Sequence, residues 1–306
     1  MIIFRSVIGQ IVWIRTEIDK AKEKVMGREE NVLIFHDTER MVKSNSKLTK
    51  AVKESTANQK FIAEDIQVGM SNYMAKYMEP AKIVISKKRS YEAAAGYKDM
   101  NICVHNFASA TTPGGGVVKG SSAQEECLCR CSTLYFSLNT PEMRGRFYTP
   151  HREAQDPKHN DDIIYTPDVY VIKTDTASPK AMPESDWYKV NVLTCAAPNL
   201  RQMPGNKMNV GDGYKKVKML DEELQALHEK RFAKILDVAV AEGNDVVILG
   251  AFGCGAFENN PEVVARAAKN VIEKYLHAFK VIEFAIYCSP RDEANYEIFR
   301  KIIGEL

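Results

Sequence analysis

The sequence has almost no net charge, few tryptophans and no apolar run long enough to cross a membrane. Its 42 Lys and Arg residues nearly balance its 40 Asp and Glu residues, which leaves a formal charge of +2. This balance excludes a protein that coats nucleic acid or another polyanion with its whole surface, although it permits a local pocket for an anion. Trp13 and Trp187 are too isolated to form a stacking platform. We expect no specific binding of DNA or RNA.

The N-terminal segment MIIFRSVIGQIVWIR lacks the features of a secretion signal. No basic region precedes it, Arg5 interrupts it, and no small-residue cleavage site follows it. It is also too short and too charged to span a bilayer, and no later stretch is more suitable. We therefore expect a soluble, cytoplasmic protein without a membrane partner, and residues 1–29 are an N-terminal extension to which we assign no role.

The cysteines do not have the pattern of a disulfide framework or of a zinc site. Seven is an odd number, and reduced thiols in a cytoplasmic protein explain it most simply. Cys127, Cys129 and Cys131 are close together, but zinc sites need a C-x2-C pair with a second ligand pair, and none follows. If this segment is helical, Cys127 and Cys131 share a face and are small core residues.

The 306 residues suffice for one large domain or for a core with an accessory piece. We place the boundary near residue 79. Residues 30–78 are the predicted helical accessory region, in which Asp37 and Thr38 suit a helix start, and no good strand precedes about residue 80. Residues 79–306 are the predicted core.

In this core, short apolar strands alternate with helical patterns. The expected strands are 82–86, 102–107, 169–173, 190–196, 246–249 and 281–287. Two sets of apolar residues recur at helical spacing: Val217, Leu220, Leu224 and Leu227, and then Val264, Ala268, Val271 and Tyr275. This alternation predicts an α/β fold with a central, mostly parallel sheet that helices cover on both faces.

Two glycine-rich loops each join a predicted strand to a predicted helix. The first contains a triple glycine, and its helix is expected to begin near Ser121 or Ser122, because Ser122 and Glu125 have the spacing of a capping box. The second reads GAFGCGAF over residues 250–257. The sequence Asn-Pro-Glu at 260–262 then gives a clear helix start.

Such loops suit a ligand that carries phosphate. Glycine lets backbone amides approach a ligand closely, and the N-terminus of a helix favours an anion. In open α/β sheets, ligands bind at the carboxyl ends of the strands, so two such loops there would suit a pyrophosphate. The alternative is that the glycines serve only tight turns. Known nucleotide motifs do not fit, because Ser121 and Glu258 replace the Lys and the Gly that those motifs need.

Two adjacent carboxylates follow the triple glycine, in the sequence Gln124-Glu125-Glu126. Adjacent residues of a helix point about 100° apart, so the two Glu residues cannot flank one bond like the usual glycosidase pair. One can reach the reacting bond while its neighbour or Gln124 orients a sugar. A Glu beside a poorly solvated anion should have a raised pKa, as a general acid needs. The alternative is a solvated acidic first turn.

The string GGGVVKGSSAQEE, residues 114–126, resembles the signature of poly(ADP-ribose) glycohydrolases. The segments NFASATTPGGG, QEECLCRCSTLY, LTCAAPN, LGAFGCGAFENNP and FHDTERMVKSNSKL resemble the bacterial-type branch of that family. The resemblance covers the chain from about residue 30 to its end. It implies a macrodomain-like, three-layer α/β/α fold with a mixed central sheet, preceded by a helical N-terminal extension.

The resemblance also implies the roles of individual residues. Glu126 would be the catalytic acid/base, and Glu125 would bind the ribose next to the scissile bond with support from Gln124. Phe257 would fix the distal ribose, which Asn106 would contact. The residues that would line the diphosphate or close its other side are Gly114, Gly115, Gly116, Gly253, Cys254, Gly255 and Ala256, and Pro198 and Asn199 would border the pocket.

The implied activity is hydrolysis of ribose–ribose O-glycosidic bonds of poly(ADP-ribose), from the chain terminus, with release of ADP-ribose. The partners would be the polymer or an ADP-ribosylated protein, and no metal or organic cofactor would be required. Two alternatives stay open: a mono-ADP-ribosyl hydrolase, and a non-catalytic reader of ADP-ribose. The Gln-Glu-Glu element favours the polymer, and intact Glu125 and Glu126 argue against a reader.

Other polar residues carry weaker signals. The six histidines have no metal spacing, and we interpret His105 as a packing residue of a strand. Arg144, Arg146 and Arg152 could attract the phosphates of the polymer, but a solvated surface loop explains them equally well.

Overall fold

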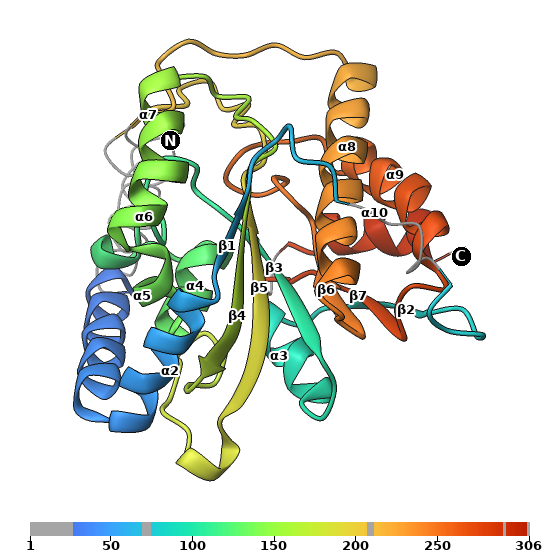
Figure 1. The fold of residues 1–306 in the computed structure, drawn as a ribbon. Coiled ribbons are helices and arrows are strands. Elements are labelled where there is room, and N and C mark those ends of the chain that lie inside the picture. Colours follow the sequence, from blue (N-terminus) through green and yellow to red (C-terminus); the bar gives the residue numbers. More distant parts are fainter. Residues whose placement is uncertain (1–26, 69–74, 207–210, 290–291, 305–306) are drawn as a thin grey trace, which may run out of the picture.

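The computed structural model describes residues 27–68, 75–206, 211–289 and 292–304. Its centre is one mixed sheet in the order β1-β4-β5-β3-β6-β7-β2 (Figure 1). The strands are β1 Lys60–Ile62, β2 Lys82–Ser86, β3 Ile102–Phe107, β4 Ile163–Val171, β5 Tyr188–Cys195, β6 Val246–Leu249 and β7 Val281–Ala285. The five strands β5, β3, β6, β7 and β2 are parallel, whereas β4 is antiparallel to β5 and to β1.

Helices cover both faces of this sheet, as the α/β prediction required. The described residues 27–44 are helical. The later helices are α2 Ser46–Ala57, α3 Ser90–Ala94, α4 Gln124–Cys131, α5 Leu134–Leu138, α6 Pro141–Met143, α7 Thr149–Ala154, α8 Asp221–Ala241, α9 Pro261–Ile272 and α10 Ala294–Ile303. In Figure 1, α8, α9 and α10 lie on one side of the sheet, and α2, α5, α6 and α7 lie on the other. The expected fold class, with its mixed sheet, is confirmed.

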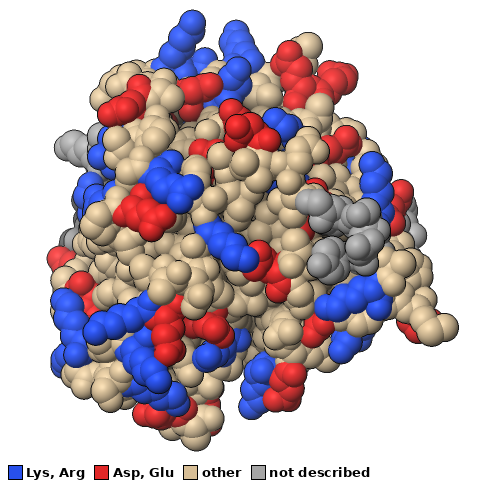
Figure 2. Space-filling model, viewed as in Figure 1, with Lys and Arg blue, Asp and Glu red and all other residues tan. Residues whose placement is uncertain are grey.

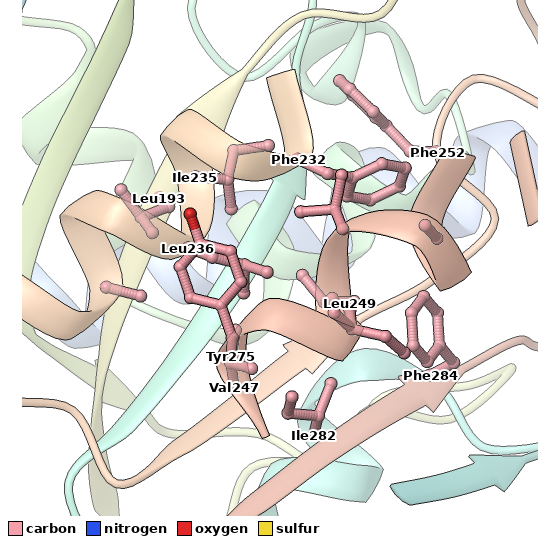
Figure 3. Close-up of a cluster of buried hydrophobic side chains, with 14 of the residues drawn as sticks. Leu193, Phe232, Ile235, Leu236, Val247, Leu249, Phe252, Tyr275, Ile282 and Phe284 are labelled. Atoms are coloured by element: carbon pink, nitrogen blue, oxygen red, sulfur yellow. The ribbon is translucent and has the colours of Figure 1, made fainter. Parts of the chain in front are cut away.

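Two apolar clusters hold these layers together. Figure 3 shows part of the first cluster, in which Phe232 and Leu236 of α8 lie near Val247 and Leu249 of β6. The second cluster fills the opposite face between the sheet and helices α3, α4 and α5. The apolar strands are buried because both of their faces contact a helical layer. Basic and acidic side chains are interspersed on the face of the molecule that Figure 2 shows, as the low net charge suggests.

Strand β1 corrects the prediction that no strand precedes about residue 80. Its three residues pair antiparallel with β4, at the edge of the sheet. A strand this short has no measurable period, so the helical pattern around it dominated the prediction. The region 30–78 therefore contributes to the sheet. Its separation from the core at residue 79 stays a prediction.

Three helix starts differ from the prediction. Asp37 and Thr38 lie inside the helix 27–44 and do not begin it. Helix α4 begins at Gln124 with Ala123 as a cap that makes no side-chain hydrogen bond, so the predicted capping box is wrong. The helical pattern was predicted to include Val217 and Leu220, but Leu220 is the exposed cap of α8, which begins only at Asp221.

The predicted start of α9 is confirmed. Asn260 accepts a hydrogen bond from the Glu262 amide at 3.1 Å, and Pro261 is the first helical residue. The apolar face that includes Val264 and Ala268 is buried as predicted. Among the described residues, no helix is long and apolar enough to cross a membrane.

Candidate active site

A cavity of about 770 Å³ opens where strands β3, β6 and β7 end. Its walls come from the two glycine loops, the first turn of α4, and the residues that follow β7. The start of the helix 27–44 forms part of the rim. The volume lies in the usual range for a small-molecule or cofactor site.

The first loop is shaped around the carboxylate of Glu126. The Gly116 amide donates a hydrogen bond to Glu126 Oε1 at 2.7 Å. Gly115 has a φ of +57°, and a β-carbon there would lie 2.5 Å from the same oxygen. Glycine is therefore required at this position, both by the backbone conformation and by the space that the carboxylate occupies.

Glu126 is buried at the cavity wall. Burial raises its pKa, and the hydrogen bond from Gly116 opposes part of that rise. Its second oxygen, Oε2, has no hydrogen-bond partner among the described residues. A buried carboxyl group with a raised pKa and one unpaired oxygen can donate a proton to a ligand in the cavity.

Glu125 is held more completely than Glu126. It accepts hydrogen bonds from the Ser109 amide at 2.8 Å and from Asn106 Nδ2 at 3.2 Å. Asn106 also donates to Thr194 Oγ1 at 3.2 Å. Burial raises the pKa of Glu125 well above its usual range, and the neighbouring Glu126 adds to this effect. These contacts fix the orientation of Glu125.

Gln124 connects α4 to the end of β3. Its side-chain oxygen accepts a hydrogen bond from the Phe107 amide at 2.9 Å. Its amide group donates to the His105 carbonyl at 2.7 Å and to Ser90 Oγ at 3.0 Å. All of its polar atoms are thus used to position the first turn of the helix.

The second loop is anchored from behind by Asn259. Its side-chain amide donates to the carbonyls of Pro198, at 2.7 Å, and Phe257, at 3.1 Å. Its oxygen accepts a hydrogen bond from His228 Nε2 at 2.8 Å. The Arg201 guanidinium lies 5.5 Å from the centre of the Phe257 ring. The loop therefore presents Phe257 beside a cation.

The structure brings most of the predicted site residues to one cavity. Those that line it are Gly115, Gly116, Gln124, Glu125, Glu126, Gly253, Gly255, Ala256 and Phe257. Gly114, Cys254 and Asn106 are not among its lining residues, and Asn106 lies behind Glu125. Pro198 and Asn199 also lie behind the wall, where the Asn199 amide donates to Asp212 Oδ2 at 2.7 Å.

The lining residues that were not predicted include Arg89, Asp175, Arg201 and Tyr287. Arg89 follows β2, Tyr287 follows β7 and Arg201 follows β5, so each comes soon after the carboxyl end of a parallel strand. That position is a signal by which they could have been found. Asp175 has no such signal, because β4 is antiparallel to its neighbour β5.

Other predicted residues have structural roles. His105 is buried against Phe107 and Phe252, and burial lowers its pKa to about 3, which confirms its interpretation as a packing residue. Cys127 and Cys131 are buried and unbridged, also as predicted. Arg144, Arg146 and Arg152 do not line the cavity. The described part of the chain contains no group of three or more His, Cys, Asp or Glu residues that could hold a metal ion.

These features define a class: an α/β protein with a ligand cavity between two glycine loops, next to a buried pair of carboxyl groups. Within that class, residues 28–174 match the family model of the catalytic domain of microbial-type poly(ADP-ribose) glycohydrolases (PARG). The predicted resemblance to the bacterial-type family is confirmed.

Solved structures of bacterial PARG share the fold. The enzyme from Thermomonospora curvata is 26% identical with a TM-score of 0.75, over 89% of this chain and 99% of that one. Its complex with the inhibitor ADP-HPD is 25% identical with a TM-score of 0.73, over the same shares. The Deinococcus radiodurans enzyme in complex with ADP-ribose is 26% identical with a TM-score of 0.70, over 83% of this chain and 98% of that one. Among curated proteins, none matches the chain.

Proposed function

We propose that this chain hydrolyses the ribose–ribose O-glycosidic bonds of poly(ADP-ribose) and releases ADP-ribose. The matched family model and the T. curvata and D. radiodurans structures agree on the enzyme class, a poly(ADP-ribose) glycohydrolase. The predicted enzyme class is thereby confirmed. We place ADP-ribose in the cavity between the two glycine loops, in the manner of a macrodomain.

The observation that carries the proposal is the setting of Glu126. Its carboxyl group is buried, its pKa is raised, one oxygen is fixed by the Gly116 amide, and the other is unpaired among the described residues. Pure binding of a diphosphate would not favour a buried acid at this place, because an ionised carboxylate repels an anion. Proton transfer to a leaving group does favour it.

The chemistry uses this one carboxyl group twice. Glu126 donates its proton to the ribose oxygen that leaves, and the C–O bond to the remaining ribose breaks. The ribosyl carbon becomes oxocarbenium-like, and the negative diphosphate nearby helps to stabilise it. Water then attacks that carbon, and the Glu126 carboxylate takes the proton from the water. Glu125 orients the ribose, and its own position depends on Asn106 and Ser109.

The glycine loops hold the rest of the ligand. Gly115 and Gly116 would line the diphosphate on one side, and the loop from Gly253 to Phe257 would close the other. Phe257 would pack against the distal ribose, and the adjacent Arg201 would favour an anion. The other proposed site residues, Gly114 and Cys254, would shape these loops from behind.

We place the cut at the chain terminus, so that free ADP-ribose is the product. Release of oligomers early in a digest would contradict this part of the proposal. A protein that carries a single ADP-ribosyl group is the alternative substrate, because the same cavity would hold its ADP-ribose. The partner is therefore the polymer or an ADP-ribosylated protein. We place the reaction in the cytoplasm, since all seven cysteines are unbridged.

The test is release of ADP-ribose from defined poly(ADP-ribose) by the wild type and by Glu126→Gln. The substitution keeps the size of the side chain but removes the titratable proton. We expect kcat to fall by about 10²-fold or more with binding of ADP-ribose retained. Glu54→Gln, at an exposed position of α2, is the matched control and should keep full activity. Equal turnover by the wild type and Glu126→Gln would refute the role of Glu126.

A further inference from the structure

Arg130 is a buried cation that the proposed chemistry does not use. It lies on α4, four residues after Glu126, so the two side chains leave the same side of the helix. Only 2% of its surface is exposed. An arginine is rarely buried to this extent without a specific partner, and no carboxylate forms an ion pair with it among the described residues.

The contacts of Arg130 lead back to Glu126. One guanidinium nitrogen donates to the Ser121 carbonyl, and another lies 3.2 Å from Cys127 Sγ. The Ser121 amide in turn donates to the Gly116 carbonyl at 3.1 Å, and the Gly116 amide donates to Glu126 at 2.7 Å. Together with the α4 backbone, these bonds form a closed ring around the loop that follows the triple glycine.

The helix 27–44 holds Arg130 in this place from outside. Thr38 Oγ1 donates to the Arg130 carbonyl at 2.5 Å. The first described turn of the same helix also contacts the loop, where Asn31 Nδ2 donates to the Gly120 carbonyl at 3.1 Å. Arg130 is thus enclosed by α4, by the loop and by this helix, and its Nε has no hydrogen-bond partner among the described residues.

We propose that Arg130 is a positioning residue for the reaction: it fixes the loop that holds Gly116 against Glu126, and it supplies a buried positive charge behind that acid. The inference rests on the proposed role of Glu126. Arg130 itself does not line the cavity, so it acts through the loop and through its charge.

The charge has a direct consequence for proton transfer. Burial raises the pKa of Glu126, and the positive charge of Arg130 lowers it. The charged and titratable groups near this acid on α4 are Glu125, Cys127, Cys129 and Arg130, and those that line the same cavity from other elements are Arg28, Arg89, Asp175, Arg201 and Tyr287. Of the four cations in this set, Arg130 is the one enclosed within protein. Removal of its charge should therefore leave Glu126 protonated to a higher pH.

The experiment compares kcat as a function of pH for the wild type, Arg130→Met and Arg130→Lys. For Arg130→Met we expect kcat to fall at least about 10-fold. We also expect the alkaline limb of the pH profile, where kcat falls as Glu126 loses its proton, to move up by about one pH unit. Arg130→Lys keeps the charge, so its alkaline limb should match the wild type. Its kcat should stay reduced, because one ammonium group cannot reproduce the fork of donors. Arg266→Met, at an exposed position of α9, is the control and should change neither quantity.

The outcomes separate this inference from the proposed function. If the wild type releases no ADP-ribose, the proposed function fails. If the wild type is active and Glu126→Gln is not, but Arg130→Met keeps the wild-type limb, only the inference about Arg130 fails. Equal losses of kcat in both Arg130 variants without a shifted limb would also overturn it. Circular dichroism checks the fold, and Arg130→Gln replaces Arg130→Met in the same comparison if the latter does not fold.

Discussion

At the scale of single residues, the two oxygens of Glu126 have different surroundings. Oε1 is fixed by the Gly116 amide, while Oε2 has no partner among the described residues. The two oxygens are therefore not equivalent, and the unpaired one is available to a ligand or to a proton. Such an arrangement costs stability, because a buried carboxyl group must lose its charge or lack full solvation.

This cost predicts a pH dependence of stability. The pKa of Glu126 is raised in the folded state, so the folded chain binds more protons than the unfolded chain between the two pKa values. Stability therefore falls as the pH rises through this window. Thermal unfolding should show Glu126→Gln gaining stability over the wild type at about pH 8, with a smaller gain at about pH 4. For Glu54→Gln the difference from the wild type should not depend on pH. A constant difference for Glu126→Gln would contradict the raised pKa.

Gly115 gives a steric prediction at the same scale. In Gly115→Ala, the new methyl group would meet Glu126 Oε1 at 2.5 Å on a backbone with a φ of +57°. We expect a loss of about 1–2 kcal/mol in the free energy of unfolding and a fall in kcat, because the carboxylate must move. Gly96→Ala is the control, since nothing lies within 4 Å of its β-carbon and its φ is not positive. Urea unfolding and ADP-ribose release measure both effects. If Gly115→Ala keeps the wild-type kcat, catalysis does not depend on the exact position of the Glu126 carboxylate.

At the scale of elements, the helix 27–44 is attached to the core by a buried lysine. Lys173 Nζ lies 2.9 Å from Asp37 Oδ2 and donates to the Ile34 carbonyl at 2.7 Å. The Lys173 side chain is 2% exposed, and Asp37 is partly open to solvent. Because Arg130 is enclosed by the same helix, this attachment also bears on the active site.

Removal of the carboxylate should leave the Lys173 charge poorly compensated. For Asp37→Asn we expect a loss of about 2 kcal/mol in urea unfolding, less than for a fully buried pair because Asp37 is partly solvated. Arg40→Ala, which removes the exposed partner of Asp37, should change stability by less than about 0.5 kcal/mol. The double variant Asp37→Asn with Lys173→Met should recover part of the loss. If Asp37→Asn is as stable as the wild type, the attachment depends on apolar contacts alone.

The elements that the sequence predicted well are those with a strong local signal. Strands β2, β3 and β6 have the predicted bounds, because each is a short run rich in apolar β-branched residues; β3 and β6 are buried, whereas β2 at the edge of the sheet is only half-buried. The start of α9 was predicted from Asn260 and Pro261, whose effects on a helix are local. Strand β1 could not be predicted, because only its pairing with β4 makes it a strand. The start of α4 was misplaced because Ser122, which has the residue type of a cap, lies in the loop.

The same distinction explains the site. Both glycine loops and the pair Glu125 and Glu126 are continuous in the sequence, so motif and spacing indicated them. The ligand contact assigned to Asn106 stays a prediction: its Nδ2 donates to Glu125 and Thr194, and its Oδ1 has no hydrogen-bond partner among the described residues. Arg89 and Asp175 come from separate elements, and only the fold brings them to one cavity. Arg89 is indicated only by its position after the end of β2, and Asp175 has no sequence signal of its own.

At the scale of the whole molecule, the two glycine loops are held from opposite faces of the sheet. The first is tied to α4, which packs in the cluster on one face. The second is tied through Asn259 to His228 of α8, which packs in the cluster on the other face. A ligand between the loops therefore contacts parts that the two layers position independently. Binding and proton transfer should respond differently when one anchor is removed.

Asn259→Ala tests this separation. It removes the hydrogen bonds to the carbonyls of Pro198 and Phe257 and leaves the buried His228 Nε2 without its partner, so we expect a loss of about 1–3 kcal/mol in stability. ADP-ribose should bind about 10-fold more weakly by calorimetry, because the second loop is no longer held in place. At saturating polymer, kcat should change much less, since the ring around Glu126 lies on the other side. Asn270→Ala, at an exposed position of α9, should behave like the wild type. A large fall in kcat with unchanged affinity would mean that the second loop takes part in proton transfer. Binding and proton transfer would then not be assigned to separate layers.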